Sequence, residues 1–160
     1  KDFVTGFIVL WFFLTHHPVR VLTTSVKDDH LRVLWGEIGR YIQTARFPLN
    51  SEKGGPLICN HRDIKKIVKG QICPISYLRG CVSEKGEAMA GHHAQYTLAV
   101  FDESSGIEDI CYERVQTWAK KVLCIGNPYD PDPGVSSFFK KGIKQGNLLA
   151  KDTSQAPIGH

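Results

Sequence analysis

The sequence predicts an α/β fold in which helices flank a mainly parallel sheet. Two largely apolar runs, YTLAVF at residues 96–101 and KVLCI at 121–125, are typical of strands that are covered on both faces. Segments with helical periodicity precede and separate them, and these are long enough to cross between parallel strands. With 160 residues, 42% apolar and 22% charged, the chain has the composition of a globular protein. We therefore expect a single domain over residues 1–160.

The first expected helix covers residues 3–14. Its apolar positions recur at helical spacing at Phe3, Phe7, Leu10, Trp11 and Leu14. The positions between them are apolar too, so we expect this helix to be buried on most of its circumference. It ends near Pro18, and the β-branched segment 19–24 follows as a strand.

The rest of the chain alternates between helices and strands. Asp28 or Asp29 is expected to cap a second helix, whose apolar face holds Leu31, Leu34, Trp35, Ile38, Tyr41, Ile42 and Ala45. A loop at 48–55 leads to weaker strands at 57–60 and 75–82, and a third helix is expected at 107–118. Residues 146–160 are expected to form a flexible tail or the start of a linker.

Targeting signals and cysteines favour an intracellular protein. The apolar run at residues 7–14 resembles a secretory segment, but it is far shorter than the ~20 residues of a membrane span, and no small-residue cleavage site follows it. Five cysteines without a C-x-x-C pair suggest reduced thiols and no zinc site. Because the only methionine is Met89, we expect the chain to begin partway through a longer protein. The net charge of +4 is compatible with an anionic partner but does not identify one.

Polar residues follow three of the expected strands, at Thr23-Thr24, Asp102-Glu103 and Gly126-Asn127. Ligands of parallel α/β sheets bind at these carboxyl ends. Asp102 is placed to hold Mg²⁺ and Glu103 to deprotonate an attacking water. Alternatively, Asp102 caps a loop and Glu103 is merely solvated.

The third strand end has a comparable pair of interpretations. Gly126 permits close approach of the backbone, and Asn127 is suited to sense a γ-phosphate and to move when it leaves. The alternative is that Gly-Asn-Pro is an ordinary turn.

A family resemblance favours the catalytic interpretation. The segment GHHAQYTLAVFDESSGIEDICYERV, followed by AKKVLCIGNP, resembles the ATPase domain of phage terminase large subunits. In that family a G-x-H-A segment leads into the Walker B strand, and a strand ending in Gly-Asn-Pro forms the coupling motif. Residues 1–38 resemble the helix after the phosphate loop, the second strand and the next helix of the same family. The resemblance covers residues 1–145 in the right order.

The resemblance implies a partial P-loop NTPase fold that uses ATP and Mg²⁺. Lys1 falls at the Walker A lysine, and Asp2 stands where Ser or Thr usually binds the metal. Thr24 is implied to bind the nucleotide, Asp102 and Asp2 the metal. The first strand and the phosphate loop would precede Lys1, so we expect the isolated 160-residue piece to bind ATP poorly and to hydrolyse it negligibly.

The resemblance also implies the biological setting. A terminase motor hydrolyses ATP to package double-stranded DNA into a procapsid, and it works with a small subunit and a portal protein in the cytoplasm of a bacterial host. The parent would form a homo-oligomeric ring without a membrane partner. The open alternatives are a helicase-like P-loop ATPase and a non-catalytic remnant that serves as a DNA-binding or assembly scaffold.

Several other residues could contact DNA, a phosphate or a metal. The arginine finger or DNA contact is not selected among Arg40, Arg46, Arg79 and Arg114. His92 and His93 are candidates for metal ligands or a proton shuttle, but lone histidine pairs are more often structural. A basic segment at Lys140, Lys141 and Lys144 could touch DNA phosphates or form a solvated face.

Overall fold

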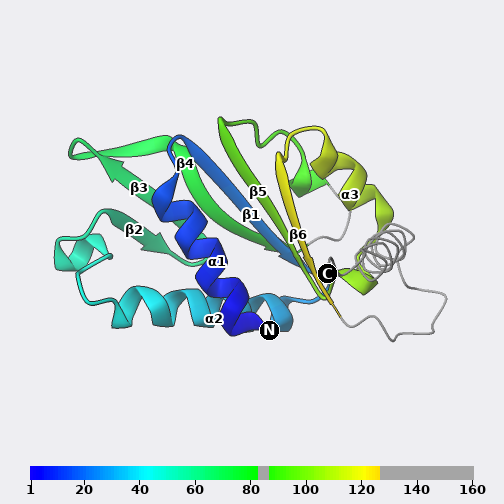
Figure 1. Ribbon diagram of the computed structural model, residues 1–160, viewed down its shortest axis with the longest axis horizontal. Coiled ribbons are helices and arrows are strands. Elements are labelled where there is room, and N and C mark those ends of the chain that lie inside the picture. The colour runs from blue at the N-terminus through cyan, green and yellow to red at the C-terminus, as the bar shows by residue number, and fades with distance from the viewer. Residues whose placement is uncertain (83–86, 127–160) are drawn as a thin grey trace, which may run out of the picture.

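The fold is α/β, with helices flanking a mixed six-stranded sheet (Figure 1). A computed structural model describes residues 1–82 and 87–126. The sheet order is β2-β3-β4-β1-β5-β6. The strands are β1 (Val19–Ser25), β2 (Leu57–Asn60), β3 (Asp63–Val68), β4 (Gln71–Val82), β5 (Tyr96–Asp102) and β6 (Lys121–Ile125).

The expectation of a mainly parallel sheet holds for only one half of it. Strands β4, β1, β5 and β6 are parallel to their neighbours, whereas β2 and β3 form an antiparallel extension beside β4. The sequence interpretation missed β3 and placed the start of β4 at Ile75. The hairpin between them turns at Lys69 and Gly70, both with positive φ (52° and 78°), as a two-residue type I′ turn requires.

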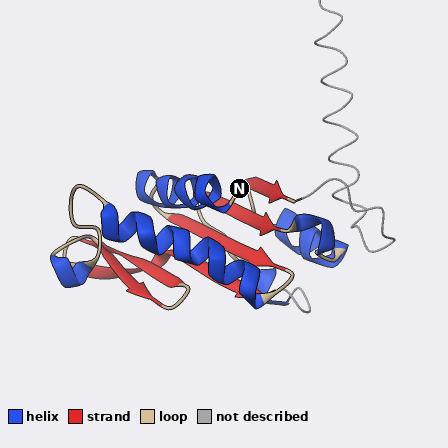
Figure 2. Cartoon of the chain, turned by 90° about the horizontal axis from the view of Figure 1, so that it is seen from below, coloured by secondary structure: helices blue, strands red, loops and turns tan. Residues whose placement is uncertain are grey.

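Three helices cover the sheet. The helices α1 (Asp2–Thr15) and α2 (Asp28–Thr44) pack against one another and lie on one face, whereas α3 (Asp109–Gln116) lies on the other. Figure 2, seen from the side of α2, shows this long helix in front of the strands and running alongside them. Short 3-10 turns occur at η1 (Ser51–Lys53), η2 (Glu87–Met89) and η3 (Ser104–Gly106). The larger core cluster lies beneath α1 and α2, and the smaller one lies beneath α3.

The first helix is present, but the expectation about its burial was wrong. Phe3, Phe7 and Trp11 are 57%, 56% and 51% exposed. The helix instead buries Val9 and Phe13, because it packs one side on the sheet and on α2 while its opposite side meets no other described element. Apolar residues all round a helix therefore did not mean burial all round.

The second helix follows the expected pattern. Its expected apolar face holds all four of its fully buried residues, Leu31, Leu34, Ile38 and Ile42. Asp28 is not the cap, however, since the helix begins after Lys27 without a side-chain cap. The Asp28 carboxylate pairs with Arg62, with Oδ2 2.9 Å from Nη2. In the described part of the chain, no helix is long and apolar enough to cross a membrane.

Candidate active site

Three parallel strands end together at one edge of the sheet. In the register of the sheet, Ser25 at the end of β1 lies opposite Asp102 at the end of β5, and Asp102 lies opposite Ile125 at the end of β6. Gly126 follows directly. Parallel strands align their carboxyl ends, so residues that are far apart in sequence meet at this edge.

The N-terminus of α1 brings a lysine to the same edge. The Lys1 ammonium lies 3.1 Å from Asp102 Oδ1, and it also donates a hydrogen bond to Glu103 Oε1. One cation is thus shared by two adjacent carboxylates, across about a hundred residues of sequence. The arrangement joins the start of the first helix to the end of the central strand β5.

The two partners of the Lys1–Asp102 ion pair differ in how deeply they are buried. The Asp102 side chain is 2% exposed, whereas that of Lys1 is 37% exposed. Burial raises the pKa of Asp102 above its usual 3.8, which the Lys1 ammonium opposes and the nearby charges of Asp2 and Glu103 reinforce. Partial burial lowers the pKa of Lys1, but the two carboxylates outweigh it and raise that pKa overall. The desolvation penalty of the pair therefore falls mainly on Asp102.

Several buried oxygens at this edge lack a hydrogen bond in the described structure. They are Asp2 Oδ1, Asp102 Oδ1, Ser25 Oγ and Ser104 Oγ. The ion pair with Lys1 reaches Asp102 Oδ1 without hydrogen-bond geometry. Buried polar atoms are almost always paired in proteins, so a group of unpaired ones at one place indicates a site that a ligand, metal or water completes.

The backbone at the site is also unusual. Glu103 has φ 50° and ψ 45°, in the left-handed region that side chains other than glycine rarely adopt. Such strain, of order 1 kcal/mol, is common at functional sites. It turns the chain sharply after β5 and presents Glu103 beside Lys1.

Gly126 packs closely against the loop that follows β5. A Cβ at this position would lie 3.0 Å from Ser104 Oγ and 3.1 Å from the Ser104 amide nitrogen. The end of β6 therefore lies close against the loop after Glu103, and a side chain at position 126 would collide with it.

The structure separates Thr24 from this cluster. Successive side chains along a strand point to opposite faces of the sheet. Leu22 packs in the core beneath α3. Thr23 points toward α2, where it accepts a hydrogen bond from Trp35 Nε1 at 2.9 Å. Thr24 therefore faces the α3 side, where the Cys81 thiol lies beside it. Ser25, which the sequence interpretation did not single out, is the β1 residue on the side of Asp102. Its position directly after two threonines at a strand end was the available signal.

The oxygen donors fit Mg²⁺ only as part of a larger complex. In the described residues no three His, Cys, Asp or Glu side chains are grouped as a metal site of protein ligands alone would require. Magnesium, however, is usually held by one or two carboxylates together with phosphates and waters. Asp102 and Asp2, with the hydroxyls of Ser25 and Ser104, suit that role.

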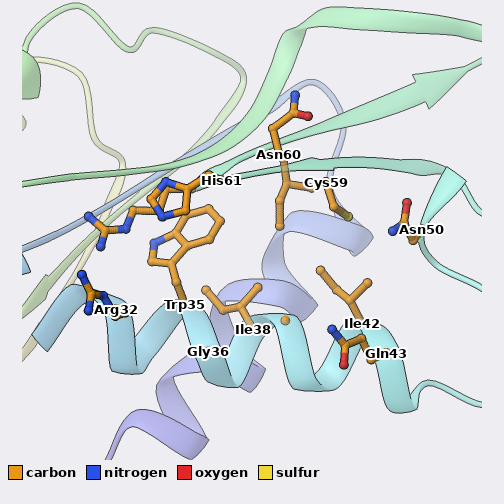
Figure 3. Close-up of a pocket in the computed structure, with 13 residues that line it drawn as sticks. Arg32, Trp35, Gly36, Ile38, Ile42, Gln43, Asn50, Cys59, Asn60 and His61 are labelled. Atoms are coloured by element: carbon orange, nitrogen blue, oxygen red, sulfur yellow. The ribbon is translucent and has the colours of Figure 1, made fainter. Parts of the chain in front are cut away.

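A separate cavity of about 330 Å³ lies between α2 and the β2–β3 hairpin. Figure 3 shows the Trp35 indole beside His61 and the Ile38 and Ile42 side chains directed from α2 toward the strand that carries Cys59. The cavity contains no carboxylate, and it is distinct from the Lys1, Asp102 and Glu103 cluster.

Of the two adjacent histidines, His92 has a structural role. His92 is buried, its Nδ1 pairs with the Tyr77 hydroxyl, and its Nε2 pairs with the Ala88 carbonyl at 2.9 Å. Burial lowers the pKa of His92, with the charges of Arg79 and Arg20 adding to the effect. His92 is therefore a neutral histidine that fastens the connector before β5 to β4.

Some of the predicted residues fall outside the described residues: Asn127, the basic segment with Lys140, Lys141 and Lys144, and the expected tail at 146–160. Of the four arginine candidates, Arg40 pairs with Glu37 at 2.8 Å on the surface of α2. Comparison of the chain with protein families, with characterised proteins and with solved structures finds no match.

Proposed function

We propose that the carboxyl edge of this sheet is the metal-binding and water-activating half of an ATPase site of the phage terminase type, within a P-loop NTPase fold. The observation that carries this proposal is the Lys1 ammonium shared by Asp102 and Glu103. Lysine and two carboxylates are the charges that phosphoryl transfer requires: a cation for the phosphate oxygens, a metal ligand and a base.

Each residue has a role that follows from its environment. Bound ATP with Mg²⁺ supplies the phosphoryl group and the metal charge that offsets it. Asp102, buried and short of hydrogen bonds, would hold the metal, assisted by Asp2. Glu103, at 31% exposure, is accessible to water and accepts a proton at Oε1 once Lys1 has moved toward phosphate.

We assign the coupling of ATP hydrolysis to movement to the end of β6. Because Gly126 fits closely against Ser104, a shift of the loop that carries Glu103 displaces the end of β6. Asn127, next along the chain, would detect loss of the γ-phosphate. This is how the proposed motor would convert hydrolysis into a change of position.

The proposal includes a strand and a phosphate loop ahead of Lys1. Among the described strands β6 pairs only with β5, so its other edge can accept a further strand. Val122 on β6 is 40% exposed. A strand paired there would end beside Lys1, Glu103 and Gly126, where a phosphate loop is needed.

The proposed partners and location are those that the resemblance to phage terminase large subunits implies. The partner is double-stranded DNA, the other proteins are a small subunit and a portal, and the working form is a homo-oligomeric ring in the bacterial cytoplasm. No observation on the described residues favours a helicase-like ATPase or a non-catalytic scaffold over this function.

The decisive experiment is Glu103→Gln in the protein that carries the residues ahead of Lys1. Steady-state ATP turnover should fall by roughly 10²–10⁴-fold, the range for loss of a general base, while ATP affinity should change little. Glu108→Gln, on a carboxylate just before α3, is the matched control and should retain turnover. Turnover that survives Glu103→Gln would refute the catalytic assignment, and absence of ATP binding in the parent would favour the scaffold.

A further inference from the structure

The half of the sheet that extends beyond β1 carries an excess of positive charge. Residues 61–79 hold five Lys or Arg and one Asp, a net +4 that equals the net charge of the whole chain. Two of these cations are occupied elsewhere: Arg62 pairs with Asp28, and Lys66 donates to the His16 carbonyl at 2.7 Å beneath α1. The remaining ones lie on the other face or in the hairpin turn.

The alternation of side chains places these remaining cations on one face. Leu78 and Ile64 point into the core beneath α1 and α2, so their neighbours Arg79 and Lys65 point to the opposite face. Arg20 lies between Val19 and Val21, which belong to the same core, and it shares the face of Arg79. The short helix η2 and α3 lie on this side, and their core cluster takes in β5, β6, Leu22 of β1 and Cys81 near the end of β4, but no residue of β2 or β3.

The cations gather around one aromatic ring. In the register of the sheet, Tyr77 has Arg20 on one side and Lys65 on the other. The guanidinium carbons of Arg20 and Arg79 lie 5.2 and 4.8 Å from the Tyr77 ring centroid, within the range of a cation–π contact. The ring therefore serves as a support that holds two guanidinium groups in place.

A single carboxylate opposes this charge. Asp63 lies 3.6 Å from Lys65 and 3.4 Å from Arg79. Arg20 has no carboxylate within ion-pair distance in the described structure. Arg79 and Lys65 remain 44% and 35% exposed, so both can reach a ligand from solvent.

We propose that this open face, formed by Arg20, Lys65, Lys69 and Arg79, binds the phosphate backbone of double-stranded DNA. The choice of DNA as the ligand rests on the function proposed above, whereas the location rests on the charges. Of the four arginines considered from the sequence, this selects Arg79 as the DNA contact.

The aromatic residue argues for a duplex rather than a single strand. Surfaces that bind single strands present exposed rings on which bases stack. Tyr77 is only 8% exposed and two guanidinium groups lie over its ring, so no base can stack there. Contacts from Arg and Lys to phosphate oxygens remain, and these position a duplex without reading its bases.

The test measures binding of a fluorescently labelled 30-base-pair duplex by the whole chain, without nucleotide, over a range of salt concentrations. Arg20→Gln/Lys65→Gln should weaken binding about tenfold near 0.1 M salt. It should also make the slope of log affinity against log salt shallower by about 2, because each lost phosphate contact contributes about 0.9. Arg46→Gln/Lys53→Gln removes two exposed cations elsewhere and should change little.

A second variant protects the test against misfolding. Asp63→Asn removes the only carboxylate that pairs with Lys65 and Arg79 among the described residues, and it should tighten binding roughly threefold, a gain that unfolding cannot produce. The surface is refuted if the two double variants behave alike, if Asp63→Asn does not tighten binding, or if a single strand binds more tightly than the duplex. Binding of anionic phospholipid vesicles in place of duplex, with the same sensitivity to Arg20→Gln/Lys65→Gln, would refute DNA as the ligand.

The outcomes of this experiment and of the turnover experiment can be told apart. Loss of DNA binding in Arg20→Gln/Lys65→Gln with turnover intact in Glu108→Gln and lost in Glu103→Gln supports both proposals. Turnover that survives Glu103→Gln refutes the ATPase assignment and leaves the charged face standing. Equal DNA binding by the two double variants refutes the face alone.

Discussion

The sheet carries two charge clusters that mirror one another in composition but differ in burial. At the carboxyl edge one lysine, Lys1, is shared by Asp102 and Glu103, whereas on the open face one carboxylate, Asp63, is shared by Lys65 and Arg79. The Asp102 side chain is 2% exposed and that of Asp63 is 25% exposed. Similar ion pairs therefore have different consequences in the two halves of the sheet.

The difference follows from what surrounds each cluster. Ser25 and Ser104 beside Asp102 have buried hydroxyls that lack hydrogen bonds, so the edge is incomplete without a further group. On the open face the charges remain in contact with water, where an ion pair is worth ~0–1 kcal/mol and the field extends about a Debye length. The first arrangement suits chemistry on a bound molecule, and the second suits attraction of a charged polymer.

The largest expected effect concerns the reactivity of two cysteine thiols. Each cysteine lies one residue before the carboxyl end of its strand. In the sheet register Cys81 lies opposite Thr24, and Cys124 lies opposite Phe101. Burial raises the pKa of each thiol from 9.0 to about 11. A pKa of about 11 in place of 9.0 lowers the thiolate fraction at pH 7 about 100-fold.

We therefore expect Cys81 and Cys124 to react with a maleimide about 100-fold more slowly in the folded chain than in the urea-unfolded chain. Mass spectrometry of peptides from timed samples would measure each rate separately. Rates equal to those of the unfolded chain would mean that water enters the core beneath α3, directly below the carboxyl edge.

The sequence predicted the elements that position the carboxyl edge and, in the extension, predicted β2 but missed β3. An unbroken apolar run predicted β5. The helices between the strands predicted that β5 is parallel to β1 and β6, as the structure has it. The strand β3 reads DIKKIV, in which two lysines mask a strand with one face in the core and one face open. A search for buried strands therefore did not find β3.

At the site itself, the sequence located residues and left side-chain direction undetermined. Asp102 and Glu103 were found because they end an apolar run. Thr24 was named from the resemblance and Ser25 was not singled out, because only the structure fixes which strand residue faces which side. The proximity of Lys1 depends on where α1 begins relative to the sheet, which no local pattern encodes.

Gly80 on β4 joins the two halves of the sheet and tests whether they are held rigidly together. A Cβ at this position would lie 2.3 Å from Trp35 Nε1, a group already fixed by its hydrogen bond to Thr23. Gly80→Ala should therefore lower the free energy of unfolding by about 2 kcal/mol, as overpacking does.

Urea denaturation would compare the free energy of unfolding of Gly80→Ala with that of Gly36→Ala on α2. A Cβ at Gly36 would meet nothing within 4 Å, so that substitution should raise stability by about 0.5–1 kcal/mol. If both substitutions stabilise the chain, Trp35 moves aside freely, and the extension is not braced against the parallel half.

The stability change on Asp102→Asn is expected to be smaller than that on Gly80→Ala, and its pH dependence is the sharpest test of burial at the edge. Burial raises the pKa of Asp102 above 3.8 in spite of Lys1, so the folded chain binds this proton more tightly than the unfolded chain. The free energy of unfolding contributed by Asp102 is then highest below pH 3.8 and falls as pH rises through the folded pKa. Asparagine carries no charge and avoids this loss.

Asp102→Asn should accordingly be more stable than the original chain by about 1 kcal/mol at pH 7, with the gap closing toward pH 4. Asp63→Asn, which removes partly exposed ion pairs, should lower stability by no more than about 0.5 kcal/mol. Urea denaturation of all three chains between pH 4 and 7 would decide the sign. A loss of stability in Asp102→Asn that grows with pH would mean that the attraction of Lys1 outweighs burial, and the carboxyl edge would then be a structural ion pair like the one on the open face.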